Sequence, residues 1–358
     1  MADTVPDAAA THVLGIDSGG SGVRVGVARA DAYGGSAAQN PPSGSPPPMP
    51  STPPMSSTPM GWPSPPLTWS SSTPVVVGDR GIDAEDLLAR VLPAARELLR
   101  EAGARRLGAV CVGAAGMATL GDDLRARLPD ALADALDVRR LALAADAVTA
   151  YAGALGQRPG AVVAAGTGLI ALGAGAATGW RRADGWGHLL GDCGGGAWIG
   201  RAGLEAAMRA YDGRDGGSKP LLARLEAVFG PATGLPGKLY PRPDRPAVLA
   251  SFAPEVARCA AEDPVAEAIL RTAARHVAEA AEAVCPRLEP SEVALAGGLF
   301  RMGAPLLTPV REELAARLPG VRVTEAAGDP LDGALCVAAA LAADELRLPR
   351  DPALLSVV

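Results

Sequence analysis

Aromatic residues are scarce in this sequence. Phe, Trp and Tyr make up 3% of its 358 residues, although apolar residues as a whole make up 48%. A core of this composition has to be built from Ala, Val and Leu. Lysine is nearly absent, since only Lys219 and Lys238 accompany the arginines. The net charge of −6 lacks the basic balance that non-specific nucleic-acid binding requires, so we expect no nucleic-acid partner.

Cysteine and histidine are also few and dispersed. The cysteines lie at Cys111, Cys193, Cys259, Cys285 and Cys336, and the histidines at His12, His188 and His276. The odd number of cysteines and the absence of a C-x-x-C pair argue against a disulfide framework and against a zinc site. We therefore expect a protein of the reducing cytoplasm.

Charge is missing from one long segment. Residues 160–179 carry no charged side chain and are long enough to cross a bilayer. Their glycines break a helix and their Val and Ile clusters favour strands, so we expect a buried hairpin. The first residues, MADTVPDAAATH, have neither a basic nor an apolar stretch, so we expect no signal peptide and no membrane partner.

Proline is concentrated in one region. Residues 34–74 hold 13 of the 33 prolines, among Ser, Thr, Gly and Met. Such a segment buries too little apolar surface to offset the entropy of ordering, and we expect a disordered insertion. A lid or a partner-docking tract is the alternative. The length of the whole chain favours two domains.

Two strand pairs are broken by glycine turns. Residues 13–17 end in Asp17 and are followed by SGGSG and a second strand at 23–28. The spacing fits neither the dinucleotide fingerprint nor the P-loop, and a tight hairpin without a ligand is the alternative. Residues 160–174 repeat the pattern around Gly166-Thr167-Gly168. Glycine turns leave backbone N–H groups accessible to an anion.

Two acidic residues stand in apolar or glycine-rich surroundings. Asp146 follows a strand expected at 140–145, and Asp192 lies in the run GWGHLLGDCGGG. Ligand sites of open α/β sheets gather at the carboxyl ends of strands. Carboxylates beside glycine turns suit phosphoryl transfer, and our hypothesis from these residues is a small-molecule kinase.

The periodicity of the chain predicts alternating helices and strands. Helices are expected at 83–99, 122–135, 147–155, 197–211, 219–229, 245–262, 264–285, 306–318 and 330–346, with further strands at 75–77, 107–112, 293–296 and 321–324. A strand pair with a glycine turn followed by strand–helix alternation appears twice. Two copies of one α/β unit would explain this order and the length.

Six segments together carry a resemblance to a known family. They are GIDSGGSGVRV, AADAVTAYAGAL, AAGTGLIALG, GWGHLLGDCGGGAWIGRAGLEAA, ALAGGLF and DPLDGALCVAAAL. The chain resembles the N-acetylglucosamine kinase and BadF/BadG/BcrA/BcrD ATPase group of the sugar kinase, Hsp70 and actin superfamily. The resemblance implies two RNase-H-like (actin-like ATPase) α/β domains around an ATP cleft. We expect domain boundaries of 1–116 with 335–358, and 117–334.

The resemblance also implies roles for particular residues. Asp17 would help to position Mg²⁺, and Asp146 would be the catalytic base. The expected contacts to ATP are Asp17, Gly19, Gly20, Ser21, Gly166, Thr167, Gly168, Gly297 and Gly298, and those to the sugar are Gly185, Trp186, Gly187 and Asp192. Phosphorylation of N-acetylglucosamine or a related amino sugar at the 6-hydroxyl is the implied reaction. Separately from the resemblance, we expect the chain to form a homodimer.

The sequence departs from the family pattern near the sugar. Cys193 stands where the family has an acidic residue, and Leu169-Ile170 stand where it has Ser-Asn. These departures leave two alternatives open. One is a non-catalytic sugar or nucleotide sensor, and the other is an ATPase activator of a radical dehydratase, which would need cysteine ligands for an iron–sulfur cluster.

Overall fold

The computed structural model describes residues 11–19, 22–30, 65–73, 75–78, 81–287 and 290–358. The chain divides into two compact units, which we describe separately. Unit 1 comprises residues 1–157 and 327–358, and unit 2 comprises residues 158–326. The last helix thus belongs to unit 1, which the chain re-enters at residue 327 rather than at the expected residue 335.

Unit 1 is built on a six-stranded sheet in the order β13-β7-β6-β1-β2-β3. Its elements are β1 (His12–Gly19), β2 (Gly22–Arg29), β3 (Leu67–Ser71), β4 (Val77–Gly78), β5 (Gly81–Ile82), α1 (Ala84–Glu101), β6 (Leu107–Ala114), α2 (Met117–Leu120), α3 (Asp122–Leu136), β7 (Leu141–Ala145), α4 (Asp146–Leu155), α12 (Pro330–Ala342) and β13 (Leu355–Val357). Strands β1, β6 and β7 run parallel, while β2 is antiparallel to both β1 and β3.

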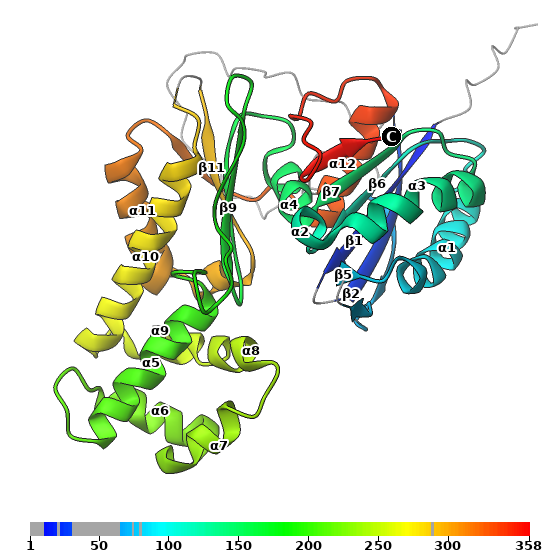
Figure 1. The fold of residues 1–358 in the computed structure, drawn as a ribbon. Helices are drawn as coiled ribbons and strands as arrows, with labels where there is room; N and C mark the ends of the chain where they lie inside the picture. Colours follow the sequence, from blue (N-terminus) through cyan, green and yellow to red (C-terminus); the bar gives the residue numbers. More distant parts are fainter. Residues whose placement is uncertain (1–10, 20–21, 31–64, 74, 79–80, 288–289) are drawn as a thin grey trace, which may run out of the picture. The chain divides into compact units, whose positions relative to one another are not determined.

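Helices cover both faces of this sheet. Helices α4 and α12 lie on one face, and α1 and α3 on the other (Figure 1). With few large aromatic side chains available, helices α4 and α12 pack through a close approach of their backbones. A Cβ at Gly333 of α12 would lie 1.8 Å from the Thr149 carbonyl oxygen of α4, and one at Gly153 would lie 2.1 Å from the Asp329 carbonyl oxygen. Glycine at these crossings lets α4 and α12 pack almost backbone to backbone.

Unit 2 has a five-stranded sheet in the order β10-β9-β8-β11-β12. Its elements are β8 (Gly160–Ala165), β9 (Leu169–Gly175), β10 (Gly179–Asp184), α5 (Gly196–Tyr211), α6 (Lys219–Phe229), η3 (Ala232–Gly234), α7 (Leu235–Leu239), α8 (Arg245–Ala250), α9 (Ala253–Cys259), α10 (Pro264–Val284), β11 (Glu292–Ala296), η4 (Gly298–Met302), α11 (Ala304–Arg317) and β12 (Arg322–Glu325). The order matches β3-β2-β1-β6-β7 of unit 1, which confirms the expected repeat of one α/β unit.

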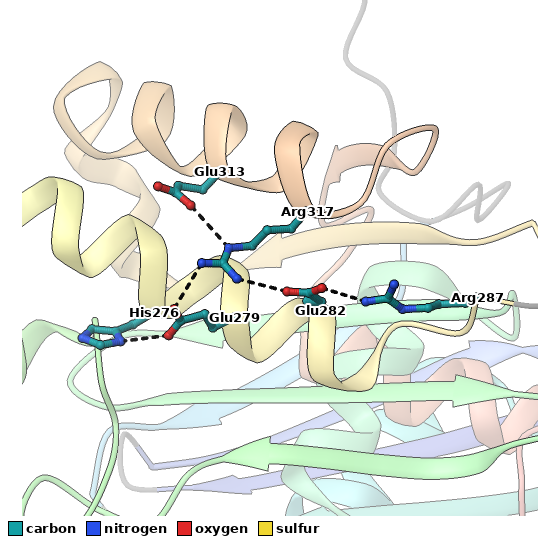
Figure 2. Close-up of polar contacts among 6 residues, drawn as sticks. All are labelled: His276, Glu279, Glu282, Arg287, Glu313 and Arg317. Atoms are coloured by element: carbon teal, nitrogen blue, oxygen red, sulfur yellow. Dashed lines mark hydrogen bonds and ion pairs between the residues drawn. The ribbon is translucent and has the colours of Figure 1, made fainter.

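Helix α10 packs on the sheet of unit 2, and α11 packs on α10 (Figure 1). Figure 2 shows how charge joins these helices: the Arg317 guanidinium of α11 contacts Glu279 at 3.2 Å, Glu282 at 3.1 Å and Glu313 at 3.3 Å. Arg287 extends the network to Glu282 at 2.7 Å. The network holds the two helices in one register beside an apolar core rich in Ala, Val and Leu.

Several expectations need correction. The unit boundary falls at 157/158 rather than at 116/117, because β7 pairs with β6 in the sheet of unit 1. Residues 67–71 of the expected disordered segment form β3, which pairs with β2. The rest of that segment up to residue 64 lies outside the described residues. The helix expected at 245–262 is two helices, α8 and α9.

The uncharged segment at 160–179 is a hairpin, as expected, because β8 and β9 pair antiparallel. Four of the described strands were not expected from the sequence: β3, β5, the C-terminal β13, and β10, which adds a third strand to this hairpin. No helix in the described part of the chain combines the length and apolarity needed to cross a bilayer.

Candidate functional site

The carboxyl ends of three parallel strands gather the acidic residues of unit 1. Ser18 of β1 is in register with Ala114 of β6, and Ala114 with Ala145 of β7. Asp17 precedes this row and Asp146 follows it. Because neighbouring strands are about 4.8 Å apart, β1 and β7 are separated by roughly 10 Å at this edge. The two acids therefore lie on one edge of one sheet.

Asp146 is the first residue of α4, and its side chain is exposed. Its Oδ1 accepts the N–H of Ala147 at 2.9 Å, and its carbonyl accepts the Thr149 hydroxyl at 3.0 Å. The residue at the N-cap position is Ala145, which has extended backbone angles. Asp146 thus stands one residue inside the helix, with its carboxylate at the solvent-facing end of the strand.

Asp17 is paired with an arginine. The Arg24 guanidinium of β2 donates from Nε at 3.0 Å and from Nη2 at 2.7 Å to Asp17 Oδ2. Its third nitrogen, Nη1, donates to Asp329, the N-cap residue of α12. Burial raises the pKa of the Asp17 carboxyl, and the Arg24 charge opposes that rise. Arg24 therefore joins the first hairpin to the start of the last helix.

The residues around Asp17 can supply only one or two protein ligands to a Mg²⁺ ion. Among the described residues, no three His, Cys, Asp or Glu side chains gather as a metal cage. One oxygen of Asp17 accepts both hydrogen bonds from Arg24. Mg²⁺ in phosphoryl-transfer sites is commonly held by one or two carboxylates, waters and the substrate phosphates. Asp17 can serve as such a carboxylate.

The first glycine turn is partly described. Gly20 and Ser21 lie outside the described residues, while Gly19 ends β1 and Gly22 begins β2. A Cβ at Gly19 would meet no described atom within 4 Å. Neither packing nor a positive φ thus explains why this position is a glycine. A ligand that approaches the backbone closely would explain it.

The second turn, at 166–168, is held by helix α5. The N–H of Gly196 donates to the Gly166 carbonyl and that of Ala197 to the Thr167 carbonyl, both at 2.8 Å. These two N–H groups of the helix end are therefore used to fix the turn. Gly166 has open space where a Cβ would lie, whereas a Cβ at Gly168 would lie 2.4 Å from Asp192 Oδ2. Gly166 is therefore open to a ligand, whereas the contact with Asp192 requires glycine at position 168.

Gly297 and Gly298 follow β11 at the same edge as the 166–168 turn, since β11 runs parallel to β8. Gly297 has a φ of +100°, and a Cβ there would lie 2.3 Å from the Ala165 carbonyl oxygen. Glycine at 297 is therefore required by packing and backbone conformation. A Cβ at Gly298 would meet nothing described within 4 Å, so Gly298 is the position open to a ligand.

The loop that follows β10 carries the expected sugar contacts. Trp186 is 66% exposed, and the Arg182 guanidinium lies 4.4 Å from its ring centroid. Asp192 has a φ of +53°, and its carboxylate accepts the Gly187 N–H at 3.2 Å. Burial raises the pKa of the Asp192 carboxyl, and the neighbouring Asp184 adds to the rise, while hydrogen bonds from Gly187 and Leu169 act in the opposite direction.

Two of the residues that depart from the family pattern, Leu169 and Ile170, are packing residues. Leu169 is 2% exposed, and the Ile170 side chain lies where a Cβ on Gly185 would fall. Cys193 is partly buried, and burial raises the pKa of its thiol. A thiol with a raised pKa stays protonated at neutral pH and is a poor nucleophile.

Sequence reasoning missed four polar residues in these regions: Arg24, Arg182, Asp184 and Asp329. Asp184 accepts the N–H groups of Asp192 and Cys193, and Arg182 donates to the carbonyls of Asp184 and Gly185. The one available signal was an arginine inside the otherwise apolar strand at 23–28. The other contacts depend on how the chain folds back on itself.

Comparison with known proteins gives a consistent result. Over 114 residues the chain is 33% identical to an N-acetylmuramic acid/N-acetylglucosamine kinase of Clostridium acetobutylicum, an alignment that covers 32% of this chain and 36% of that kinase. The chain thus matches about a third of that relative's length.

Two solved structures are similar over most of their length. A candidate N-acetylglucosamine kinase from Chromobacterium violaceum superimposes with a TM-score of 0.65 and 26% identity, covering 91% of this chain and 98% of that one. A second candidate N-acetylglucosamine kinase, from Porphyromonas gingivalis, has a TM-score of 0.59 and 18% identity and covers 90% and 97%. The second, at its lower identity, supports the fold alone.

The family match extends over both units. Residues 14–342 match the BadF/BadG/BcrA/BcrD ATPase family, and this range contains all six segments named above. The two repeated sheets, the glycine turns at their carboxyl edges and this match agree with one another. The chain therefore belongs to the BadF/BadG/BcrA/BcrD ATPase family.

Proposed function

We propose that the chain is an ATP-dependent kinase that phosphorylates N-acetylglucosamine or a related amino sugar at the 6-hydroxyl. The observation that carries the proposal is a set of three glycines, Gly19, Gly166 and Gly298. Each lies at the carboxyl edge of a sheet, and each has neither a positive φ nor a described neighbour that would require glycine. Bare backbone at these edges suits the phosphates and the adenosine of ATP.

Asp146 is the proposed catalytic base. Phosphoryl transfer passes through a loose transition state, so an enzyme acts mainly by positioning groups and neutralising charge. An exposed carboxylate at the strand end can accept the proton of a sugar hydroxyl, which typically contributes about 10²- to 10⁴-fold to the rate. Mg²⁺, when bound with ATP near Asp17, would supply charge neutralisation on the phosphates.

The proposed acceptor contacts are Gly185, Trp186, Gly187 and Asp192. An exposed indole beside a carboxylate is a common means of binding a sugar, because the ring packs on the C–H face while the carboxylate accepts hydroxyls. The choice of an N-acetylated amino sugar rests on the relatives, whose names specify N-acetylglucosamine and, for one of them, N-acetylmuramic acid.

The two alternatives receive less support. The sensor hypothesis rested on lost polar contacts at 169, 170 and 193, but Leu169 and Ile170 lie in packing positions. The activator hypothesis needs accessible cysteine ligands, whereas Cys111, Cys285 and Cys336 are buried. We retain the homodimer and the cytoplasmic location as predictions, and light scattering would test the former.

A coupled ADP-release assay over a sugar panel tests the proposal. N-acetylglucosamine, N-acetylmuramic acid, glucosamine and glucose would be compared, with 6-deoxy-N-acetylglucosamine as an analogue that lacks the acceptor hydroxyl. We expect ADP release with the first or second sugar, none with the analogue, and a 6-phosphate identified by NMR. ADP release that no sugar stimulates would contradict a kinase of these sugars.

A further inference from the structure

A single carboxylate closes the loop that carries the proposed sugar contacts. Asp184, the last residue of β10, accepts the Asp192 N–H at 2.6 Å through Oδ1 and the Cys193 N–H at 2.9 Å through Oδ2. Residues 185–191 are thus joined at their base by one side chain. A Cβ at Gly191 would lie 2.3 Å from Asp184 Oδ1, so glycine at 191 makes room for this contact.

The same carboxylate determines where Asp192 lies. Asp184 and Asp192 both have positive φ, +59° and +53°, which is unfavourable for residues other than glycine unless contacts hold them. With its backbone held by Asp184, Asp192 directs its carboxylate toward the Gly187 N–H and against Gly168 of the second glycine turn. The side chain of Asp192 therefore links the acceptor loop to the turn proposed to hold phosphate.

Arg182 fixes the other side of the loop. Its Nε donates to the Asp184 carbonyl at 3.0 Å and its Nη2 to the Gly185 carbonyl at 2.9 Å, while the guanidinium stacks on Trp186. The indole is held by these contacts although most of its surface is exposed. Arg182 and Asp184 thus hold Trp186 and Asp192 in place, one from each side of the same bend.

We propose that Asp184 is the positioning residue of the acceptor site, holding Asp192 and the loop at 185–191 in the geometry that binds the sugar. The inference rests on the proposed function for the assignment of this loop to the acceptor. Asp184 acts through Asp192 and the backbone, because its oxygens are engaged by the two N–H groups. A loop ordered before binding loses less conformational freedom when the substrate arrives, so its order contributes directly to affinity.

Two variants of Asp184 give a graded test. Asp184→Asn tolerates a positive φ and keeps one oxygen for the Asp192 N–H, but places an amide against the Cys193 N–H. Asp184→Ala removes both acceptors. We expect the KM for the sugar to rise about tenfold for Asn, the scale of one lost charge-assisted hydrogen bond, and further for Ala. The KM for ATP should stay within about twofold, because the N–H groups of Gly196 and Ala197 hold the 166–168 turn independently of Asp192.

Asp263→Asn is the matched control. Asp263 also accepts two backbone N–H groups, from Val265 and Ala266, and lies in the same unit at the start of α10. The Asp263→Asn variant should have a lower melting temperature and an unchanged KM for the sugar. Hydrogen exchange at the amides of Asp192 and Cys193 provides a readout independent of turnover, and it should accelerate in the Asp184 variants and stay unchanged in Asp263→Asn.

The outcomes separate the two proposals. A wild-type protein that phosphorylates no sugar overturns the proposed function, whatever Asp184 does. A wild-type kinase whose sugar KM is unchanged by Asp184→Ala overturns the positioning role alone. Unchanged exchange at the two amides, or KM values for ATP and sugar that rise in equal proportion, would also overturn it.

Discussion

Single residues at the carboxyl edges of the two sheets carry the chemistry proposed for this chain. Asp146, Asp17 and Arg24 belong to one edge, and the 166–168 turn to the other. Some of these residues also have a structural role, since Arg24 pairs with Asp17 and Asp146 accepts the Ala147 N–H. Substitutions that remove one role and keep the other are therefore the informative ones.

Replacing Asp146 by Asn should lower kcat by about 10²- to 10⁴-fold, because the amide cannot accept the proton of the sugar hydroxyl. The fold should be unaffected, since an amide oxygen can still accept the Ala147 N–H. Steady-state kinetics with a melting curve as control checks this. A variant that keeps wild-type kcat would show that Asp146 is not the base.

Replacing Arg24 by Met should destabilise unit 1 in a pH-dependent way. Asp17 would remain largely buried without its cation, which costs about 1–2 kcal/mol at pH 7 after allowance for the one-third exposure of Arg24. Without Arg24 the pKa of Asp17 rises further above its unfolded value, so the carboxyl binds its proton more tightly in the folded state. The deficit should therefore shrink as pH falls through that raised pKa.

Urea unfolding at pH 7 and pH 4.5 measures this difference, with Arg24→Lys as the charge-conserving control. The lysine variant should lose less stability at pH 7 than the methionine variant, because it keeps a positive charge beside Asp17. Equal losses for Arg24→Met at both pH values would contradict the coupling to Asp17.

Replacing two nearby glycines by alanine should affect different properties, ATP binding for Gly166 and stability for Gly168. Gly166→Ala places a methyl group in open space and should raise the KM for ATP with little change in stability. Gly168→Ala places it against the Asp192 carboxylate, so the turn or the loop must move, at a cost of about 1–3 kcal/mol. Thermal melting and ATP kinetics on both variants separate ligand approach from packing.

At the scale of elements, α4 and α12 depend on an unusually close crossing. A Cβ at Gly333 would lie 1.8 Å from a backbone oxygen of α4, which no side-chain movement can relieve. We expect Gly333→Ala to cost about 3 kcal/mol or more in the free energy of unfolding. Gly237→Ala in α7, where a Cβ meets open space, is the control and should be neutral or slightly stabilising.

Denaturant titration of both variants would decide this prediction. A Gly333→Ala protein as stable as the wild type would mean that α4 and α12 can separate without loss. The crossing matters for function as well, because α4 carries Asp146 and α12 begins at Asp329, the partner of Arg24.

At the scale of the whole molecule, the Pro-rich region can be tested by replacement. Val27 of β2 pairs with Leu67 of β3, so the chain must return only to the neighbouring antiparallel strand, about 4.8 Å away. A short Gly-Ser linker in place of residues 31–64 can make that connection. We expect the melting temperature to change by at most about 2 °C, because loop-closure entropy depends weakly on length.

Calorimetry and sugar-kinase kinetics on the shortened chain would check this. The full-length chain is the reference, and a second variant that also lacks residues 65–71 should be destabilised because it loses β3. A large loss of stability on replacing 31–64 alone would show that those residues contribute to the fold.

Much of the fold was predictable because it depends on local pattern. The hairpins at 13–28 and 160–174, the strand ending before Asp146 and the long helix near 264–285 were all expected where they occur. The prediction of one helix at 245–262 was wrong, because helical periodicity does not reveal the break at Ser251 and Phe252. β3 was hidden by the proline-rich composition around it.

The sequence by itself determined the two glycine turns, the strand-end position of Asp146 and the repeated α/β order, because glycine conformation and apolar periodicity act over a few residues. Only the tertiary structure decided that Arg24 joins Asp17 to Asp329, which lies 305 residues beyond Arg24, and that Asp184 holds Asp192. It also sorted the glycines into those that packing requires and those left open. Such choices depend on which distant atoms the packed chain brings together, and no short-range pattern encodes them.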